Sequence, residues 1–557
     1  MLKKTFPAIE FATLAITVFL MAANVAEGAS SPSVALTGQV SSQEEARMGG
    51  VLVSAKREGS TVTTTVVSDA QGKYSFPTAK LDPGRYALHI RAVGYELDGA
   101  QAEVKAQNTT QLDLKLRKAK DLAAQLSNGE WLLSFPGTNE QKQGLLSCVG
   151  CHTVERIARS RYSAEEFVPL LKRMRNYAQG SSPLRPQVRP GAREPSANQL
   201  QQMTRFAQYL STINLSKVSK WEYPLKTLPR PKGKGSQVII TEYDLPRPEA
   251  MPHDAAIDAG GMIWYSDFGS QYLGKLDPRS AKVVEYPVPV TKPGAPAGAL
   301  DLRFDPDGNV WLGMMYQGSI AKFDRTTEKF QTWNAPKFME NDEARLAMVD
   351  PAHINLDGKV WIGGDDEFRL DVKTGEWHTI DYSRGLPKDG PPADRLGSYG
   401  VISDSKNNFY GTNFGGQYII RIDAKTLNVT PFPTPTPNSA PRRGHMDPQD
   451  RLWFAEYRGN MLGMFDTKTE RTREWAMLTQ WTNPYDAILD KDGYAWTGGM
   501  SNDHVVRLNT KTDEFIEYLL PRTTNIRRVN IDNSTGRPVL WIGNNLGATI
   551  IKIEPLQ

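Results

Sequence analysis

The stretch Asp305-Pro-Asp-Gly-Asn-Val-Trp311 is one copy of a motif that recurs through residues 238–557. Asp357-Gly-Lys-Val-Trp361 and Asp490-Lys-Asp-Gly-Tyr-Ala-Trp496 keep its acidic residue, glycine and tryptophan. The aromatic residue returns every 43 to 50 residues, at Trp264, Trp311, Trp361, Tyr410, Trp453, Trp496 and Trp541. A period of this length indicates a repeat architecture in which each unit is one supersecondary element.

Each unit also carries the signals of further short strands. A strand ending in Asp or Asn follows the aromatic strand, as at Phe323-Asp324 and Phe465-Asp466, and an outer strand such as 330–333 or 515–518 comes next. Four strands per unit and seven units predict a seven-bladed β-propeller over residues 238–557. We expect residues 238–243 to supply the outer strand that closes the ring.

The blade pattern resembles that of the streptogramin (virginiamycin) B lyase family. Pro252-His253 precedes a glycine turn, Trp264-Tyr-Ser-Asp267 sets an acidic residue after the tryptophan, and Leu273-Gly-Lys-Leu-Asp277 follows. The same order runs from Pro441-Arg442 through Trp453-Phe-Ala-Glu456. The resemblance covers the propeller only. It implies a metal-assisted elimination in which a histidine is the base and acidic residues hold magnesium at the central mouth of the ring.

Carried onto this chain, the resemblance puts His253 at a family histidine and Asp267 at an acidic metal-site position. The chain departs from the family at Met251, where the family has an acidic residue. It departs again at Arg442, which takes the place of the second family histidine, since His445 lies three residues out of register.

The residues alone also predict a polar centre, because equivalent positions of all blades face one channel. The positions before the inner strands are His253, Tyr399, Arg442 and Tyr485, and those after the aromatic residues are Asp267, Asn413, Glu456 and Asn544, with Asp365 close by. His353 falls near the same level. Such a cluster is a candidate small-molecule site, although polar residues also line wet channels in binding propellers. We take His253, Arg442 and Tyr485 as candidate catalytic residues, and Asp267 and Glu456 as candidate ligands for Mg or Ca.

Cys148-Val149-Gly150-Cys151-His152 contains the only two cysteines of the 557-residue chain. This spacing is typical of c-type haem attachment, in which two thiols form thioethers to one porphyrin and the following histidine ligates iron. A zinc site needs a second pair of ligands, and a thioredoxin-like dithiol would accompany a βαβ pattern. The sequence shows neither, so we predict covalent haem c on Cys148, Cys151 and His152.

The haem motif lies in residues 118–218, which we predict to be a small helical domain. Ser163-Ala-Glu-Glu166 is a capping box that opens a helix to about Arg175, and Ser196 begins a last helix. The segment resembles a single-haem cytochrome c domain. For the sixth iron ligand, Met174 ends a helix before a looping stretch, whereas Met203 lies on an apolar helix face. We choose Met174 and keep Met203 as the alternative.

The N-terminal part predicts export and one further domain. Lys3 and Lys4 precede the apolar stretch 11–23 and then small residues, as in a secretory signal over residues 1–30, with an uncleaved anchor as the alternative. Residues 31–117 predict a β-sandwich, and the runs 72–76, 81–86 and 94–95 resemble the carboxypeptidase regulatory-like module. Residues 219–237 are rich in Pro and Lys and predict a linker.

The fold class is therefore mostly β and multidomain: an N-terminal β-sandwich, a small all-α cytochrome c domain and a C-terminal seven-bladed β-propeller. The net charge is +4 without a long basic run, which argues against nucleic acid as a partner. We expect a periplasmic or otherwise exported protein with a redox partner, a small-molecule ligand and no stable membrane span after signal cleavage. Three functions stay open. The first is electron transfer by the haem, coupled to binding or oxidation of a small molecule at the propeller mouth. The others are a metal-dependent lyase of the streptogramin lyase type with an accessory cytochrome, and a non-catalytic binding or docking module.

Overall fold

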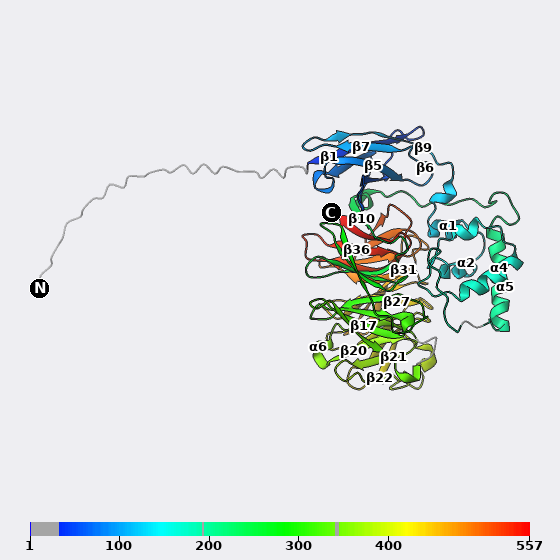
Figure 1. Ribbon diagram of the computed structural model, residues 1–557, viewed down its shortest axis with the longest axis vertical. Helices are drawn as coiled ribbons and strands as arrows, with labels where there is room; N and C mark the ends of the chain where they lie inside the picture. The colour runs from blue at the N-terminus through cyan, green and yellow to red at the C-terminus, as the bar shows by residue number, and fades with distance from the viewer. Residues whose placement is uncertain (2–32, 192–193, 340–344) are drawn as a thin grey trace.

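The computed structural model describes residues 1, 33–191, 194–339 and 345–557. They form an N-terminal β-sandwich, a helical segment and a set of propeller-like sheets (Figure 1). The predicted signal segment, apart from Met1, lies outside the described residues. Within these ranges no helix has the length and apolar character that a membrane crossing requires.

The sandwich consists of two sheets around one apolar core that includes Leu36, Val53 and Phe76. Strand β1 lies between β4 and β9 in one sheet, and the other sheet has the order β3-β2-β5-β7. The strands are β1 (Val34–Ser42), β2 (Leu52–Arg57), β3 (Val62–Val67), β4 (Lys73–Pro77), β5 (Gly84–Arg91), β6 (Tyr95–Glu96), β7 (Ala100–Val104), β8 (Thr110–Gln111) and β9 (Leu114–Lys118).

The helical segment follows the sandwich and contains five α-helices in its described residues. They are α1 (Asn128–Ser134), α2 (Asn139–Gln143), α3 (Glu155–Ala158), α4 (Ala164–Arg175) and α5 (Ala197–Ile213). The predicted capping box before α4 is present, because the Ser163 hydroxyl accepts from the Glu166 amide while the Glu166 side chain accepts from the Ser163 amide. Ser196 and Gln199 cap α5 in the same way. These boxes fix where the two longest helices begin.

The remaining strands form six antiparallel sheets of four strands each, together with one half of an eight-stranded sheet. The first three sheets are β11 (Pro252–Ile257), β12 (Ile263–Asp267), β13 (Tyr272–Asp277), β14 (Lys282–Pro287); β15 (Asp301–Phe304), β16 (Val310–Met314), β17 (Ser319–Asp324), β18 (Lys329–Asn334); and β19 (Leu346–Asp350), β20 (Lys359–Gly364), β21 (Glu367–Asp371), β22 (Trp377–Thr379). The turn between β19 and β20 contains α6 (Ile354–Asp357).

The next three sheets and the final strands complete the propeller-like part. They are β23 (Gly400–Ser403), β24 (Phe409–Thr412), β25 (Tyr418–Ile422), β26 (Val429–Pro433); β27 (Pro441–Met446), β28 (Arg451–Glu456), β29 (Met461–Asp466), β30 (Arg471–Ala476); β31 (Pro484–Leu489), β32 (Tyr494–Gly499), β33 (His504–Asn509), β34 (Phe515–Leu519); and β35 (Ile526–Asp532), β36 (Val539–Asn544), β37 (Thr549–Pro555) with β10 (Val238–Asp244). The first strands contact one another in the order β11, β15, β19, β23, β27, β31 and β35, and β35 contacts β11 again.

Strand β10 joins the two ends of the propeller-like part and also joins it to the sandwich. It pairs antiparallel with β37 from Val238↔Pro555 to Asp244↔Thr549, as expected for residues 238–243. Its other edge pairs with β3, where Ile239 faces Val66. The resulting eight-stranded sheet runs β35-β36-β37-β10-β3-β2-β5-β7. Backbone hydrogen bonding is therefore continuous from the sandwich into the ring.

The recurrent motif has a local physical cause. The Asp305 carboxylate accepts the amides of Asp307 and Asn309 and the indole N–H of Trp311, the last at 2.9 Å. Gly308 has φ +80°, a left-handed conformation that suits glycine. The same aspartate-to-indole bond joins Asp258 to Trp264, Asp447 to Trp453 and Asp490 to Trp496. The motif thus closes a turn and also gives the indole N–H of a buried tryptophan a hydrogen-bond acceptor.

Candidate functional site

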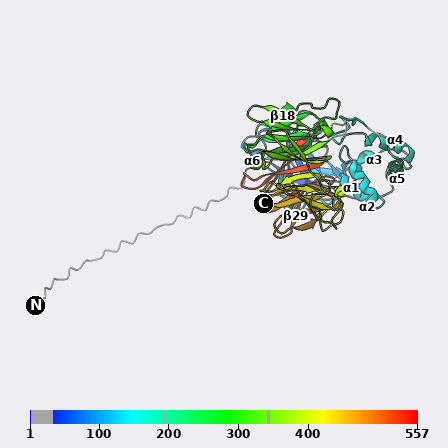
Figure 2. The ribbon, with the colours of Figure 1, turned by 90° about the horizontal axis from the view of Figure 1, so that it is seen from below.

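The helical segment covers one end of the ring of first strands, which we call the covered mouth; the opposite end is the far mouth. Figures 1 and 2 show this segment on one side of the propeller-like sheets. The Gly129 amide donates to the Ser501 carbonyl at 2.6 Å, and the Arg185 guanidinium donates to the Ser270 hydroxyl at 2.7 Å. The Gln187 side-chain amide donates to the Gly269 carbonyl. Contacts therefore anchor the segment at both sides of the mouth.

The Cys148–His152 turn is part of this interface. The Asn525 side-chain amide donates to the Val149 carbonyl at 3.0 Å, and the Arg527 guanidinium donates to the Gly150 carbonyl at 3.4 Å. The Arg527 guanidinium also lies 5.3 Å from the ring centroid of Tyr485. One arginine therefore contacts both the turn and a residue of the covered mouth.

The turn presents donors that fit a covalent haem. The Cys148 and Cys151 thiols are free of disulfide bonds. The Nδ1 atom of His152 lies 2.8 Å from the carbonyl oxygen of its neighbour Thr153, so a proton on Nδ1 is donated there and the Nε2 lone pair is left for a metal. Burial lowers the pKa of His152 and keeps the ring neutral, as ligation requires.

The thiols do not have the features of a reactive dithiol. Burial raises the pKa of Cys148 to about 11 and also raises that of Cys151. Redox-active cysteines have lowered pKa values, because the thiolate is the nucleophile. The predicted sixth ligand Met174 lies in the last turn of α4 and is 38% exposed, and the alternative Met203 lies half-buried on α5.

His253 and Tyr485, predicted to face the channel, meet at the covered mouth. The Nδ1 atom of His253 lies 2.7 Å from the Asp254 carboxylate, and its Nε2 atom lies 3.1 Å from the Tyr485 hydroxyl. Burial lowers the pKa of His253 to about 3, so the ring is neutral. We assign the proton to Nδ1, which makes Nε2 the acceptor of the Tyr485 O–H. The Tyr399 hydroxyl lies 2.5 Å from that of Tyr485 and extends the chain.

Arg442 fills the mouth beside this chain. Its guanidinium is nearly buried and lies within 4.1 to 5.2 Å of the ring centroids of Tyr399, Phe414, Tyr457 and Tyr485. One of its N–H groups points at the Met500 sulfur at 3.5 Å. Four rings around one cation compensate the loss of water by cation–π attraction. The arrangement packs the mouth tightly under the helical segment.

Directly beneath the mouth lies an ionic layer that the sequence analysis did not identify. Arg443 donates to Asp254 at 2.9 Å and is also bonded to Asp301, and Arg528 donates to Asp301 at 3.1 Å. Asp486 accepts from His445 at 3.0 Å. Although burial opposes ionisation, Arg443 and His253 lower the pKa of Asp254, and His445 and Arg528 lower that of Asp486 to about 2. The layer is therefore charged at neutral pH.

Bulges at the starts of the first strands explain why neighbouring residues form both the covered mouth and the ionic layer beneath it. The pairing register shifts between Pro252 and Asp254. The same shift occurs at 441–444, 484–487 and 526–529. A bulge inserts an unpaired residue and re-aims side chains. The side chains of two consecutive residues therefore face the channel, as in Arg442-Arg443 and Tyr485-Asp486. The available signal was the ionisable residue directly after His253, Arg442 and Tyr485.

The candidate metal ligands Asp267 and Glu456 have different surroundings. Asp267 accepts from Arg247 at 2.5 Å and from the amides of Met251, Gly269 and Ser270. Glu456 is fully buried without a hydrogen-bond partner for either oxygen, and burial together with the nearby Glu474 raises its pKa to about 9. Within the described part of the chain, no three His, Cys, Asp or Glu side chains group as a metal site would require.

The remaining predicted positions lie apart from this cluster. Asn413 donates to the carbonyls of Arg395 and Gly397, Asn544 donates to the Thr523 carbonyl, and Asp365 pairs with Arg345. Each closes a loop of its own sheet. His353 lines a cavity at the far mouth.

Comparison with known proteins adds the following. Residues 35–117 match the carboxypeptidase regulatory-like domain family. No curated protein sequence matches the chain. Among solved structures, a streptogramin B lyase has 20% identity and a TM-score of 0.49, covering 58% of this chain and 99% of that chain. Selenomethionine-substituted virginiamycin B lyase from Staphylococcus aureus has 20% identity and a TM-score of 0.48, covering 57% of this chain and 99% of that chain.

Proposed function

We propose that the chain is an exported c-type haem protein that transfers electrons, with its haem segment docked on the covered mouth of a seven-bladed β-propeller. Support for seven blades comes from the closed cycle of seven first strands. The observation that carries the haem is the turn itself: two free thiols followed by a histidine whose Nδ1 atom contacts the Thr153 carbonyl. Bound covalently there, haem would supply one-electron transfer, with a periplasmic redox partner as its donor or acceptor.

The residues of the covered mouth have a positioning role in this proposal. His253 and Tyr485 are completely buried, and Arg442 is 8% exposed. His253 and Tyr485 are hydrogen-bonded to each other, and the Arg442 guanidinium lies over the Tyr485 ring. Enclosed in this way, these residues are suited to hold the Cys148–His152 turn in one orientation. A rigid environment limits reorganisation around a redox centre. We therefore assign small-molecule binding to another part of the ring.

The visible spectrum of protein exported by a host that matures c-type cytochromes tests the proposal. We expect a c-type α-band on reduction that remains with the polypeptide after acid–acetone extraction. The matched control is the double variant Cys148→Ala/Cys151→Ala, which leaves His152 in place and should lack covalent haem. A wild-type protein without any haem band, or with haem that is fully extracted, would refute the assignment.

A further inference from the structure

The far mouth contains a cavity of about 300 Å³ that the electron-transfer proposal does not use. Strand β11 begins at the covered mouth, where Pro252 pairs with Asp267, and runs away from it toward Ala256. The cavity is lined by Asp254 and Ala256 from this strand and by residues at corresponding levels of β15, β23, β27 and β35. It therefore occupies the end of the channel opposite the helical segment, and the ionic layer forms its floor.

The carboxylates that line the cavity already have partners. Asp254 accepts from Arg443, His253 and the Leu302 amide. Asp350 accepts from the Ala352 amide at 3.1 Å and from the Ser403 hydroxyl at 3.0 Å. Their lone pairs are used by the protein, so they contribute little that could bind a cation.

The cationic groups that line the cavity keep unused donors. Arg303 donates through one Nη atom to the Val401 carbonyl, and its Nε atom, which makes no hydrogen bond, lies 3.6 Å from Asp301. Arg528 donates through Nη1 to Asp301, and its Nε atom lies 3.6 Å from Asp486. Each guanidinium has five N–H donors, so both have N–H groups to spare. His353 lines the same cavity and is partly exposed.

The charges on this side of the channel are crowded as well. Burial and the neighbouring cations Arg303 and Arg443 lower the pKa of Arg528 to about 10, although the carboxylates of Asp486 and Asp254 act in the opposite direction. A bound anion between the arginines would offset this repulsion. Part of the wall is apolar and includes Phe304, Ile402 and Met446, which suits a short hydrocarbon part next to a charged head.

From this arrangement we propose that the far-mouth cavity binds a small organic carboxylate, with Arg303 and Arg528 donating to the carboxylate and the apolar wall holding its hydrocarbon part. A planar guanidinium matches two carboxylate oxygens, which gives such a site its geometric preference. The proposal stands apart from the haem, since it needs only the ring.

Isothermal titration calorimetry of the full-length protein tests it, with butyrate, succinate, benzoate and inorganic phosphate as probes and choline as the cationic control. We expect at least one carboxylate to bind more tightly than phosphate, and choline not to bind. No heat with any carboxylate, or phosphate bound as tightly as the best one, would overturn the proposal.

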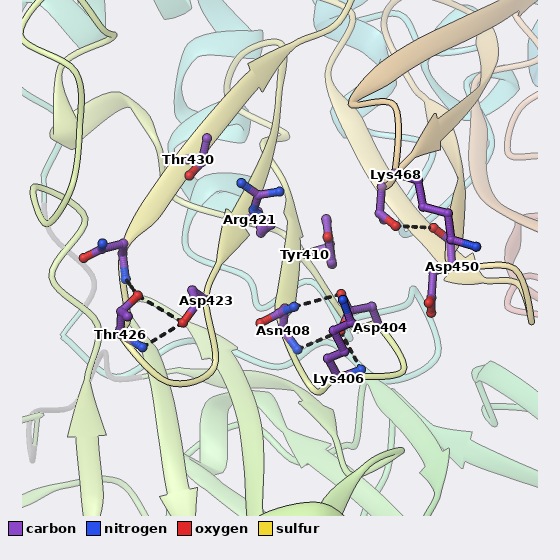
Figure 3. Close-up of a pocket in the computed structure, with 12 residues that line it drawn as sticks. Asp404, Lys406, Asn408, Tyr410, Arg421, Asp423, Thr426, Thr430, Asp450 and Lys468 are labelled. Carbon is purple, nitrogen blue, oxygen red and sulfur yellow. Dashed lines mark hydrogen bonds between the residues drawn. The ribbon is translucent and has the colours of Figure 1, made fainter.

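Two variants locate the site. Arg303→Gln removes one charged donor and should weaken carboxylate binding roughly 10- to 100-fold. His353→Ala changes a partly exposed residue at the rim of the cavity and should weaken carboxylate binding less. This variant still tests the proposal if circular dichroism shows that Arg303→Gln folds poorly. The matched control is Arg421→Gln, in the polar groove formed by β24, β25 and neighbouring turns that Figure 3 shows. Unchanged affinity in both far-mouth variants, or equal loss in Arg421→Gln, would contradict the assignment.

Discussion

The side-chain amide of Asn525 donates a hydrogen bond to the carbonyl oxygen of Val149 across 3.0 Å. The same amide also donates to the Met500 carbonyl at 3.3 Å. One buried residue of the ring therefore holds the turn between the two cysteines and fixes it relative to the next sheet. Because the turn carries the proposed haem ligands, this contact couples the helical segment to the covered mouth.

Asn525→Ala should loosen that coupling. The Val149 carbonyl loses its donor at a buried interface, which costs about 1 kcal/mol or somewhat more. Hydrogen exchange of residues 145–160 should rise while exchange of the sandwich strands stays unchanged. The control Asn533→Ala alters an exposed asparagine of the same sheet and should leave the turn protected. Equal protection of the turn in both variants would show that Asn525 does not hold it.

Tyr485→Phe should destabilise the ring. The hydroxyl lies between Tyr399 and His253, and its loss leaves the buried Nε2 atom of His253 without a donor. We expect the free energy of unfolding in urea to fall by about 1–3 kcal/mol. Tyr418→Phe, which changes a half-buried tyrosine on β25, is the control and should cost far less. Similar losses in the two variants would argue against a hydrogen-bonded chain at the mouth.

Glu456→Gln should change how stability depends on pH. The folded pKa of about 9 lies above the ordinary value of 4.5, so the folded chain keeps a proton that the unfolded chain releases between these values. The contribution of Glu456 is therefore fully present below pH 4.5 and is lost as the pH rises toward 9. Glutamine cannot ionise, so the variant should gain stability over wild type with rising pH, on the order of 4 kcal/mol between about pH 5 and pH 8.

Urea unfolding of wild type and Glu456→Gln at about pH 5 and pH 8 measures this gain. The control Glu376→Gln replaces an exposed glutamate and should follow wild type at both values. A difference between Glu456→Gln and wild type that does not grow with pH would mean that Glu456 ionises normally.

Met174→Ala tests the predicted sixth iron ligand. Methionine ligation raises the potential of a haem, so its loss should lower the midpoint potential and remove the spectral features of methionine coordination. Met203→Ala is the matched variant on α5 and should keep both. If Met203→Ala alone changes the spectrum, Met203 is the ligand, and if neither does, the ligand lies elsewhere.

The repeat period and turn motif predicted the four-strand units, because each unit repeats the same local bonds from aspartate to tryptophan. The closing strand was also predictable, since 238–243 reads as a strand with no partner nearby in sequence. The pairing of β10 with β3 was not, because an edge contact between distant segments leaves no periodic signal.

The mouth was predictable only in part for a similar reason. Alternation along a strand turns successive side chains to opposite faces, so His253 and Tyr485 were expected in the channel and Asp254 and Asp486 were not. Bulges at those positions override the alternation. The covering of the mouth depends on contacts such as that of Asn525 with Val149, which join residues hundreds of positions apart.

The most direct test of the central claim is the mass of the tryptic peptide 143–156, taken from protein exported by a host that matures c-type cytochromes. This peptide contains Cys148, Cys151 and His152 and no internal cleavage site. We predict that it carries one haem through two thioether bonds and that neither cysteine reacts with an alkylating reagent. A peptide that lacks haem and in which both cysteines are alkylated would contradict the account.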